Sequence, residues 1–483
     1  MSRQQRLTLV ATILGSTVVF LDGTVVNVAL PAIRDDLDAG LAGQQWVVEA
    51  YLLTMVSLLL VGGSLGDQFG RRRMYVAGLL TFGATSALCA VAPSDEFLVA
   101  ARALQGMAGA LLVPGSLALV AATFEGEARG KAVGTWTAWT GIATVVGPAG
   151  GGALIGLASW RAVFWINLPL IAATLYLTLR AVRESRDPDA VPGVDRAGIL
   201  LSAIGLGGPV FALIEQPSHG WDDPRVWVPL VGGVLCFALF IVHEARTRHP
   251  MLDLGLFRIR NFAVANLTTF AAYAGLIGGL FFATLFLQQV AGYSAFEAGL
   301  ATTPISVLLF VLSPRFGRIA SGTGPRLPMT VGPIVGGVGL LLMLRVGPEA
   351  DYLTDLLPAI VVFGVGLAAT VAPLTATVLD SVQERRVGVA SGINNGVSRV
   401  AGLLAIAALG AVISARFDAG VGREIASSPL TAAAPDASTD AFHLGIVIAG
   451  LLMILGGIAA GIGIEDPGQR AEAIPSRDPA SAG

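Results

Sequence analysis

The sequence is poor in charge and in cysteine. Asp, Glu, Lys and Arg make up 13% of its 483 residues, against about 25% in a typical soluble domain. Both cysteines, Cys89 and Cys236, lie inside apolar runs, so neither a disulfide framework nor a cysteine metal site is indicated. Apolar residues make up 54% of the chain. The shortage of charge excludes an ordinary soluble domain and indicates a protein of the lipid bilayer.

Long apolar runs fill the chain. A helix needs about 20 mainly apolar residues to cross a bilayer, and the sequence predicts an all-α polytopic membrane protein. We expect fourteen spans, at about 7–33, 44–63, 74–92, 97–119, 132–156, 163–181, 196–215, 226–243, 262–290, 297–314, 327–346, 354–378, 387–414 and 442–464. No small-residue cleavage site ends the first run, so it is predicted to span the membrane rather than to serve as a signal peptide.

Basic residues are unevenly distributed between the two sets of loops. With fourteen spans, 22 of the 30 basic residues fall at the termini and in the loops on their side. Two lie within spans, and six lie in the opposite loops: Arg34, Arg161, Arg225, Arg345, Arg416 and Arg423. Cytoplasmic loops of membrane proteins carry the excess of Lys and Arg. Both termini are therefore predicted to be cytoplasmic.

The segment 62–73 places four glycines and four charges between two apolar runs, and a related segment, 317–326, follows 254 residues later. Asp67 and Arg71 stand at i and i+4, where opposite charges can meet on a helix. The alternative is a basic signal that only fixes topology. Ser321 takes the place of Asp67 in the second copy. The repeat predicts two related six-helix bundles.

We expect four parts along the chain. They are an N-terminal bundle (1–190), an extra helix pair (191–250), a C-terminal bundle (251–466) and a cytoplasmic tail (467–483). The tail is predicted to be disordered, because it is short of apolar residues.

Three charged residues lie within or near the ends of predicted spans. A charge at the bilayer centre costs about 3 kcal/mol, so it usually faces a cavity or a partner. The alternative for Asp22 is a structural hydrogen bond to a neighbouring helix, and for Arg102 it is snorkelling to the surface. Glu49, near the outer end of the second span, either reaches the interface or adds a second acid to an outward-facing cavity.

Two further groups stand out. The fifth span carries Gly141, Gly147, Pro148, Gly151 and Gly152. Small residues one turn apart permit close helix crossing, and proline allows a bend. The thirteenth span begins with the polar residues Asn394, Asn395 and Arg399. The simplest role of the two asparagines is hydrogen bonding between helices.

These motifs together resemble the major facilitator superfamily, and in particular its fourteen-helix drug:proton antiporter family. The superfamily's loop between helices 2 and 3 is matched at Gly63, Leu65, Asp67, Gly70, Arg71 and Arg72. The antiporters' first-helix motif is matched at Asp22, Asn27 and Pro31. The fourth span resembles the motif whose arginine is linked to proton transfer, here Arg102. The glycines and proline of the fifth span resemble the motif that accompanies antiport.

The resemblance implies a major facilitator fold with two additional helices. We expect this pair to be peripheral to the transport path, because its spans contain almost no ionisable residue apart from Glu215. It implies proton-coupled export of drug-like or antibiotic-like molecules across a bacterial cytoplasmic membrane. Asp22 is expected to be the main coupling acid, with Glu49 as an auxiliary that favours cations, and Asp67 with Arg71 to latch the two bundles. We expect a monomer that needs no cofactor beyond the proton gradient and binds no nucleic acid.

Two alternatives stay open. One is a dedicated exporter of a single self-made metabolite or antibiotic, because pocket side chains decide the substrate range. The other is an intramembrane enzyme, which would need a catalytic constellation at membrane depth. The four histidines, His219, His243, His249 and His443, lie at the margins of spans. A nucleotide-binding loop of the lysine-containing type is absent from the sequence, so ATP is not expected to drive the protein.

Overall fold

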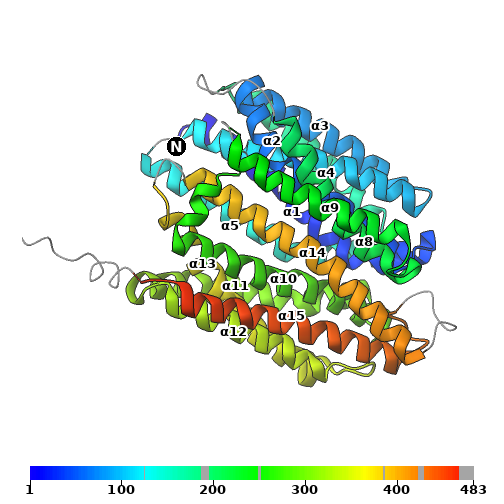
Figure 1. Cartoon of the computed structure of the whole chain (residues 1–483). Coiled ribbons are helices and arrows are strands. Elements are labelled where there is room, and N and C mark those ends of the chain that lie inside the picture. The colour runs from blue at the N-terminus through cyan, green and yellow to red at the C-terminus, as the bar shows by residue number, and fades with distance from the viewer. Residues whose placement is uncertain (125, 187–194, 248–251, 384–386, 422–428, 467–483) are drawn as a thin grey trace, which may run out of the picture.

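The computed structural model describes residues 1–124, 126–186, 195–247, 252–383, 387–421 and 429–466 (Figure 1). Two predicted domain boundaries, at 190/191 and 250/251, and the predicted tail at 467–483 lie outside the described residues. The described part of the chain is helical. Its α-helices are α1 (Arg3–Leu37), α2 (Leu41–Phe69), α3 (Arg71–Ala90), α4 (Asp95–Thr123), α5 (Gly126–Leu157), α6 (Ala162–Trp165), α7 (Asn167–Ala181), α8 (Arg196–His219), α9 (Pro224–Arg246), α10 (Arg260–Gln289), α11 (Ala295–Thr323), α12 (Arg326–Leu342), α13 (Leu357–Asp380), α14 (Val387–Val421) and α15 (Pro435–Gly463).

Each predicted span corresponds to a helix, with the short α6 and α7 together matching the sixth. Within the described residues, eleven helices are long and apolar enough to cross a membrane, or twelve if the two parts of α2 form one span. The helix α3 begins with three arginines and is not among them, yet it packs beside α4. A polytopic helical membrane protein is confirmed, whereas the number of fourteen spans stays a prediction.

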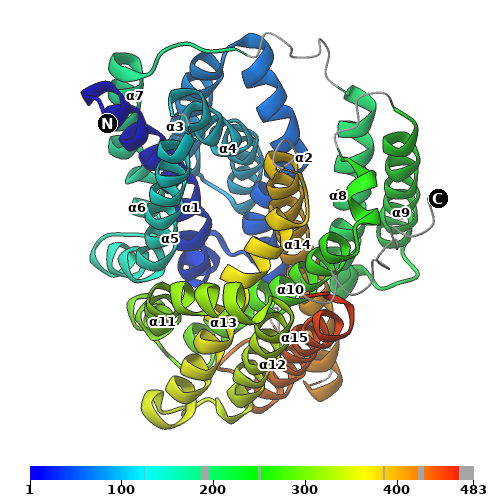
Figure 2. The same ribbon diagram turned by 90° about the vertical axis from the view of Figure 1, so that its left-hand side faces the viewer.

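The helices form two bundles and a separate pair (Figure 2). Helices α1 to α7 make the N-terminal bundle, and α10 to α15 make the C-terminal bundle. The pair α8 and α9 packs together to one side, with α8 against α2 and α14.

Local sequence explains where several helices begin and end. Ser2 and Ser294 each form a capping box with the residue three positions later, which satisfies two free backbone N–H groups of a helix start. Gly70 ends α2 at φ 113°, and Gly324 ends α11 at φ 90°. Only glycine adopts such backbone angles without strain. These two glycines occupy equivalent positions of the internal repeat, so both copies turn in the same way.

One apolar cluster joins the two bundles at the end away from the N-terminus. It includes Leu30 and Phe164 of the N-terminal bundle together with Phe286 and Phe442 of the C-terminal bundle, all buried. At the opposite end, the clusters built from described residues stay within one bundle each. The bundles are therefore sealed together at the far end.

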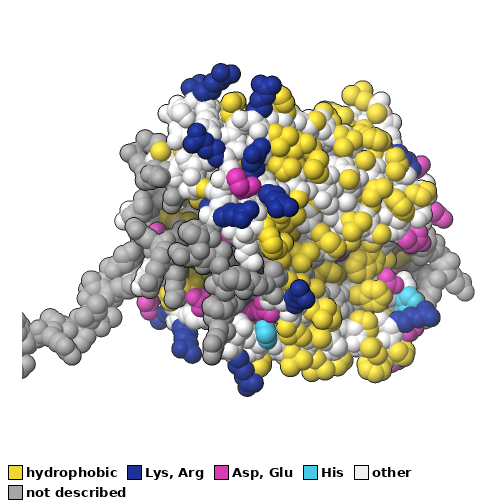
Figure 3. Space-filling model, turned by 90° about the horizontal axis from the view of Figure 1, so that it is seen from above, with side chains coloured by type: hydrophobic (Ala, Val, Ile, Leu, Met, Phe, Trp, Pro, Cys, Tyr) yellow, Lys and Arg dark blue, Asp and Glu magenta, His cyan; other side chains and the backbone are white. Residues whose placement is uncertain are grey.

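The surface separates charge from apolar side chains. Seen from above, Lys and Arg side chains gather at the end that holds the N-terminus in Figure 1, and an apolar band lies beside them (Figure 3). An apolar band of this kind suits the hydrocarbon core of a bilayer.

Candidate functional site

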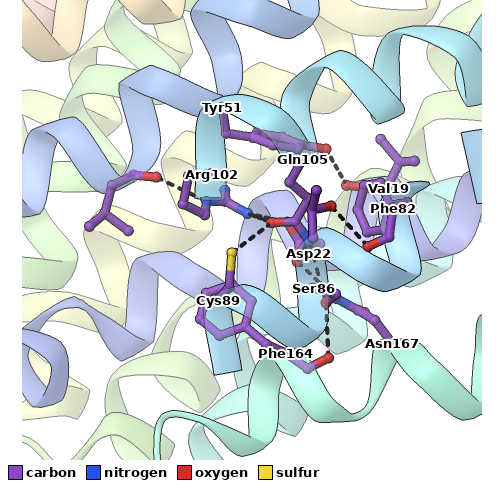
Figure 4. Close-up of polar contacts among 12 residues, drawn as sticks. Val19, Asp22, Tyr51, Phe82, Ser86, Cys89, Arg102, Gln105, Phe164 and Asn167 are labelled. Atoms are coloured by element: carbon purple, nitrogen blue, oxygen red, sulfur yellow. Dashed lines mark hydrogen bonds and ion pairs between the residues drawn. The ribbon is translucent and has the colours of Figure 1, made fainter. Parts of the chain in front are cut away.

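A buried ion pair links two helices of the N-terminal bundle (Figure 4). Asp22 of α1 accepts a hydrogen bond from Nη1 of Arg102 on α4, and its side chain has no exposed surface. Its other carboxylate oxygen accepts from Nε2 of Gln105 at 3.0 Å and from Nδ2 of Asn167 on α7 at 2.9 Å. Asn167 also donates to the hydroxyl of Ser86 on α3 at 3.0 Å. The network thus joins four helices.

Arg102 is held from several sides. Its Nε donates to the carbonyl of Val47 on α2 at 3.0 Å, and its Nη1 donates to Oε1 of Gln105 at 2.8 Å. The guanidinium lies 4.2 Å from the ring centre of Tyr51, a favourable cation–π distance. The side chain is 1% exposed. The prediction of a partner for Arg102 is confirmed, and snorkelling to the surface is wrong.

Removing one member of this network has a large cost. Breaking a buried ion pair by deleting one partner costs about 3–5 kcal/mol, because the remaining charge is left uncompensated. Asp22 is the one carboxylate on the guanidinium of Arg102 among the described ion pairs. A proton that binds to Asp22 would remove that counter-charge.

Glu49 of α2 is different. Its side chain is fully buried, so the prediction that it might reach the interface is wrong. Among the described residues, neither carboxylate oxygen has a hydrogen-bond partner. Asn27, matched to the same family motif as Asp22, is half-buried with its carbonyl oxygen also unpartnered. No described hydrogen bond brings Asn27 or Glu49 into the Asp22 network.

The segment between α2 and α3 is tied to the end of α7. Asp67 and Arg71 form the predicted ion pair, with Oδ1 and Nε 2.8 Å apart. The backbone N–H groups of Arg72 and Arg73 donate to the carboxylate of Glu184 at 3.0 and 3.1 Å. These contacts lie within the N-terminal bundle. A latch from Asp67 and Arg71 to the C-terminal bundle stays a prediction.

The second copy of the repeat carries the same tie. The backbone N–H of Arg326 donates to Asp466 at 3.1 Å, and its Nε donates to the carbonyl of Gly461. Arg326 is the repeat equivalent of Arg72, whose Nη2 donates to the carbonyl of Leu179. Each acid therefore follows the last helix of its bundle and accepts from the start of the third, where the helix dipole favours negative charge.

The predicted antiport glycines are points of close helix approach. A Cβ at Gly147 would meet Thr24, and one at Gly151 would meet Val25, both on α1. A Cβ at Gly152 would collide with the backbone of Ala295 and Phe296 on α11. These glycines and Pro148 therefore allow α5 to pack closely against α1 of its own bundle and α11 of the other bundle at the sealed end. Gly141 lies nearer the middle of the same helix.

The three polar residues of α14 make three different kinds of contact. Nδ2 of Asn394 donates to Thr269 at 2.7 Å and to Asn266 at 3.2 Å, which holds α14 to α10. Asn395 donates to a backbone carbonyl of its own helix. Arg399 crosses to the other bundle, where its guanidinium lies 3.8 Å from the sulfur of Met55 and 5.7 Å from the ring centre of Phe20. The interhelical role is confirmed for Asn394.

Several residues of these sites were not predicted from sequence. Gln105 stands three positions after Arg102, on the same helix face, and this spacing could have identified it. Glu184 and Asp466 follow apolar runs without any motif that marks them.

A pocket of about 920 Å³ on the C-terminal bundle, lined by Tyr293, Glu297 and Tyr352 among others, contains none of the predicted residues. Within the described residues, no group of three or more His, Cys, Asp or Glu is placed to hold a metal ion.

Comparison with known proteins connects this arrangement to a family. Residues 12–406 match the Major Facilitator Superfamily. The chain is 37% identical to the multidrug resistance protein Stp of Mycobacterium tuberculosis (strain CDC 1551 / Oshkosh) over 87% of this chain and 78% of that protein. It is 35% identical to the methylenomycin A resistance protein of Bacillus subtilis (strain 168), over 86% and 89% of the two chains.

Two further comparisons agree. The tetracenomycin C resistance and export protein of Streptomyces glaucescens is 34% identical over 85% of this chain and 76% of that protein. The fold resembles the crystal structure of a bacterial homolog of the human lysosomal transporter Spinster, with a TM-score of 0.66 and 16% identity over 96% and 97% of the two chains. The chain therefore belongs to the Major Facilitator Superfamily of transporters rather than to the enzymes, and its relatives are the drug-resistance and efflux proteins of the fourteen-helix group.

Proposed function

We propose that this protein exports drug-like or antibiotic-like small molecules across the bacterial cytoplasmic membrane in exchange for protons. The observation that carries the proposal is the ion pair of Asp22 and Arg102, buried between helices at membrane depth. Ionisable residues within membrane spans commonly mark proton relays and solute pathways. The names of the relatives supply the class of substrate.

In this proposal Asp22 binds and releases the proton, and the interactions of Arg102 change in response. Protonated Asp22 no longer neutralises the guanidinium, which keeps its bond to the carbonyl of Val47. The positions of α1, α2 and α4 then depend on the charge of one carboxylate. Gln105 and Asn167 hold that carboxylate in place. Protonation and helix movement become two parts of the same step.

The proton gradient supplies enough free energy for export. One proton moving inward at about 100 mV releases ~2.3 kcal/mol. At about 1.4 kcal/mol for each tenfold ratio, that sustains roughly a 50-fold gradient of a neutral solute. No cofactor is needed, and the proposal requires a single copy of the chain.

The sealed end of the molecule supports an orientation. The distribution of basic residues favours a cytoplasmic N-terminus, so the end at which both bundles meet is proposed to be external. The described state is then closed towards the outside. Transport would proceed by rocking of the two bundles about a site between them, as in transporters built from such repeats.

Export of one antibiotic is the second candidate. The relatives include a protein named for multidrug resistance and two named for single antibiotics, methylenomycin A and tetracenomycin C. Those names support either a broad or a narrow substrate range for this chain.

Transport by inside-out vesicles tests the proposal. Vesicles with an imposed pH gradient should accumulate cationic dyes or neutral antibiotics, and a protonophore should abolish the accumulation. Asp22→Asn should reduce it to background. Asp35→Asn is the matched control, because Asp35 is an exposed acid of the same helix, and should transport like wild type. Normal gradient-driven accumulation by Asp22→Asn would reject the assigned role.

A further inference from the structure

The extra helix pair covers the junction between the two bundles. Helix α8 packs against α2 of the N-terminal bundle and α14 of the C-terminal bundle, and Figure 2 shows it beside both. One apolar cluster includes all three helices, with Val210 on α8 and Leu403 on α14 both fully buried. The indole of Trp46 on α2 also donates to Glu215 on α8 at 3.1 Å. We call this cluster the three-helix seam. Its residues are Leu206, Val210, Leu213, Ile214, Val400, Leu403, Leu404, Ala407, Ala42, Trp46, Leu52, Leu53 and Val56.

Glu49 occupies the middle of the α2 face in the three-helix seam. On α2, the seam residues Ala42 and Trp46 stand seven and three positions before Glu49. Leu52, Leu53 and Val56 stand three, four and seven positions after it. Residues at these spacings share one face of a helix. One turn before Glu49, the amide of Gln45 donates to the carbonyl of Ile406 on α14 at 2.8 Å. Glu49 thus lies where the two bundles and the extra pair meet.

Charged side chains on the surrounding helices are occupied elsewhere. On α8, Glu215 accepts from Trp46 and lies 3.6 Å from His219. On α14, Arg399 contacts Met55 and Phe20, and Arg416 pairs with Asp440. Asp22 on α1 and Arg102 on α4 pair with each other, and the arginines of α3 lie at its N-terminal end. In the part of the chain that the structure describes, none of them forms a hydrogen bond or ion pair with Glu49.

We propose that Glu49 is a second proton-binding site, protonated when the three-helix seam is closed. A carboxylate buried without a hydrogen bond or counter-charge costs several kcal/mol, and such groups take up a proton instead. Closing the seam therefore binds a proton, and opening it allows the proton to leave. The inference deepens the proposed antiport and assigns the extra pair a role as cover for this site, in place of the peripheral role expected from sequence.

The location of Glu49 determines from which side of the membrane protons reach this site. It lies near the beginning of α2, towards the sealed end of the molecule. When the bundles part at that end, Glu49 is reached by water from the side proposed to be external. Binding of an external proton would then permit the seam to close, so closure of this end depends on the pH of the external side.

Crosslinking across the seam tests the inference without any substrate. Cysteines are placed by Gln45→Cys and Gly410→Cys, because a Cβ at Gly410 would touch the side chain of Gln45, in a chain whose two native cysteines are replaced. With Glu49 present, crosslinking should fall severalfold as the pH rises. Glu49→Gln, neutral at every pH, should remove that dependence. Glu215→Gln is the matched control, because it also neutralises an acid of this junction, and should behave like the parent.

Each result decides a separate question. A pH dependence that persists unchanged in Glu49→Gln, or is lost in Glu215→Gln, overturns the inference. If Glu49→Gln does not fold, Glu49→Asp takes its place: a shifted pH midpoint supports the site, and an unchanged midpoint overturns it. If wild-type vesicles show no gradient-driven export while the seam responds to pH through Glu49, the proposed antiport fails and the proton site stands.

Discussion

Asp22 and Glu49 are both buried acids of the N-terminal bundle, on adjacent helices, and their surroundings are opposite. Asp22 accepts hydrogen bonds from three side chains and has an arginine as counter-charge. Glu49 has neither. Burial alone therefore does not specify what an acid does. A carboxylate with a full set of donors is stabilised in its charged form, whereas one surrounded by apolar side chains is stabilised only when neutral.

Protonation of the two acids is therefore expected to act at two different places in the molecule. The Asp22 network lies inside one bundle, so it can change the shape of that bundle. Glu49 lies between bundles, so its protonation can change how they fit together. The following predictions test whether this difference in surroundings produces a difference in behaviour.

The largest effect is expected when Asp22 alone is neutralised. Asp22→Asn leaves Arg102 buried without a counter-charge, which should lower stability by about 3–5 kcal/mol and reduce export to background. The double variant Asp22→Asn with Arg102→Gln removes both charges and should recover much of the melting temperature in detergent, though not transport. Equal melting temperatures for the single variant and wild type would contradict the structural part of this account.

Giving Glu49 a partner should make it resemble Asp22. Leu403→Gln places an amide donor in the three-helix seam, where it can stabilise a charged carboxylate. The pH dependence of crosslinking between positions 45 and 410 should then weaken severalfold. Leu403→Met, similar in size but without a donor, should leave the pH dependence as it is. If both variants respond alike, the surroundings of Glu49 do not control its protonation.

Forcing the sealed end open should affect the two acids unequally. Gly152→Leu pushes α5 away from α11, because even a Cβ collides with the backbone there. Export should fall about tenfold, and crosslinking across the three-helix seam should fall with it. The Asp22 network lies within one bundle, so the thermal stability of that bundle should be unchanged in Gly152→Leu. Gly156→Leu is the control one turn later, where a Cβ meets nothing within 4 Å, and should transport normally.

The smallest effect is expected at Asp67. Its side chain is 35% exposed and pairs with Arg71 one turn away on the surface, where such pairs contribute about 0.5 kcal/mol or less. Asp67→Asn should therefore leave the melting temperature nearly unchanged while slowing export a few-fold, if the segment latches the bundles. Ser321→Ala, at the equivalent position of the second copy, should change neither. An unaltered export rate in Asp67→Asn would reduce the segment to a topology signal.

The sequence predicted the helices well because length and apolar content decide which segments cross a membrane. It also predicted that Arg102 needs a partner. It could not identify Asp22 as that partner, since the two residues are 80 positions apart and meet only through helix packing. The seam around Glu49 was harder still. A membrane helix is apolar on most of its faces, so hydrophobic periodicity does not show which face meets a neighbouring helix.

The paired ties at Glu184 and Asp466 have a consequence for how this chain could have grown. In each bundle the last helix is fastened to the start of the third, so the helices from the third to the last are closed into a ring by contacts of that half. Neither ring depends on the length of the segment that connects them. A connector that does not hold either ring together tolerates the insertion of further residues. The helices α8 and α9 stand at this connector, where an additional hairpin could enter the gene without breaking either ring.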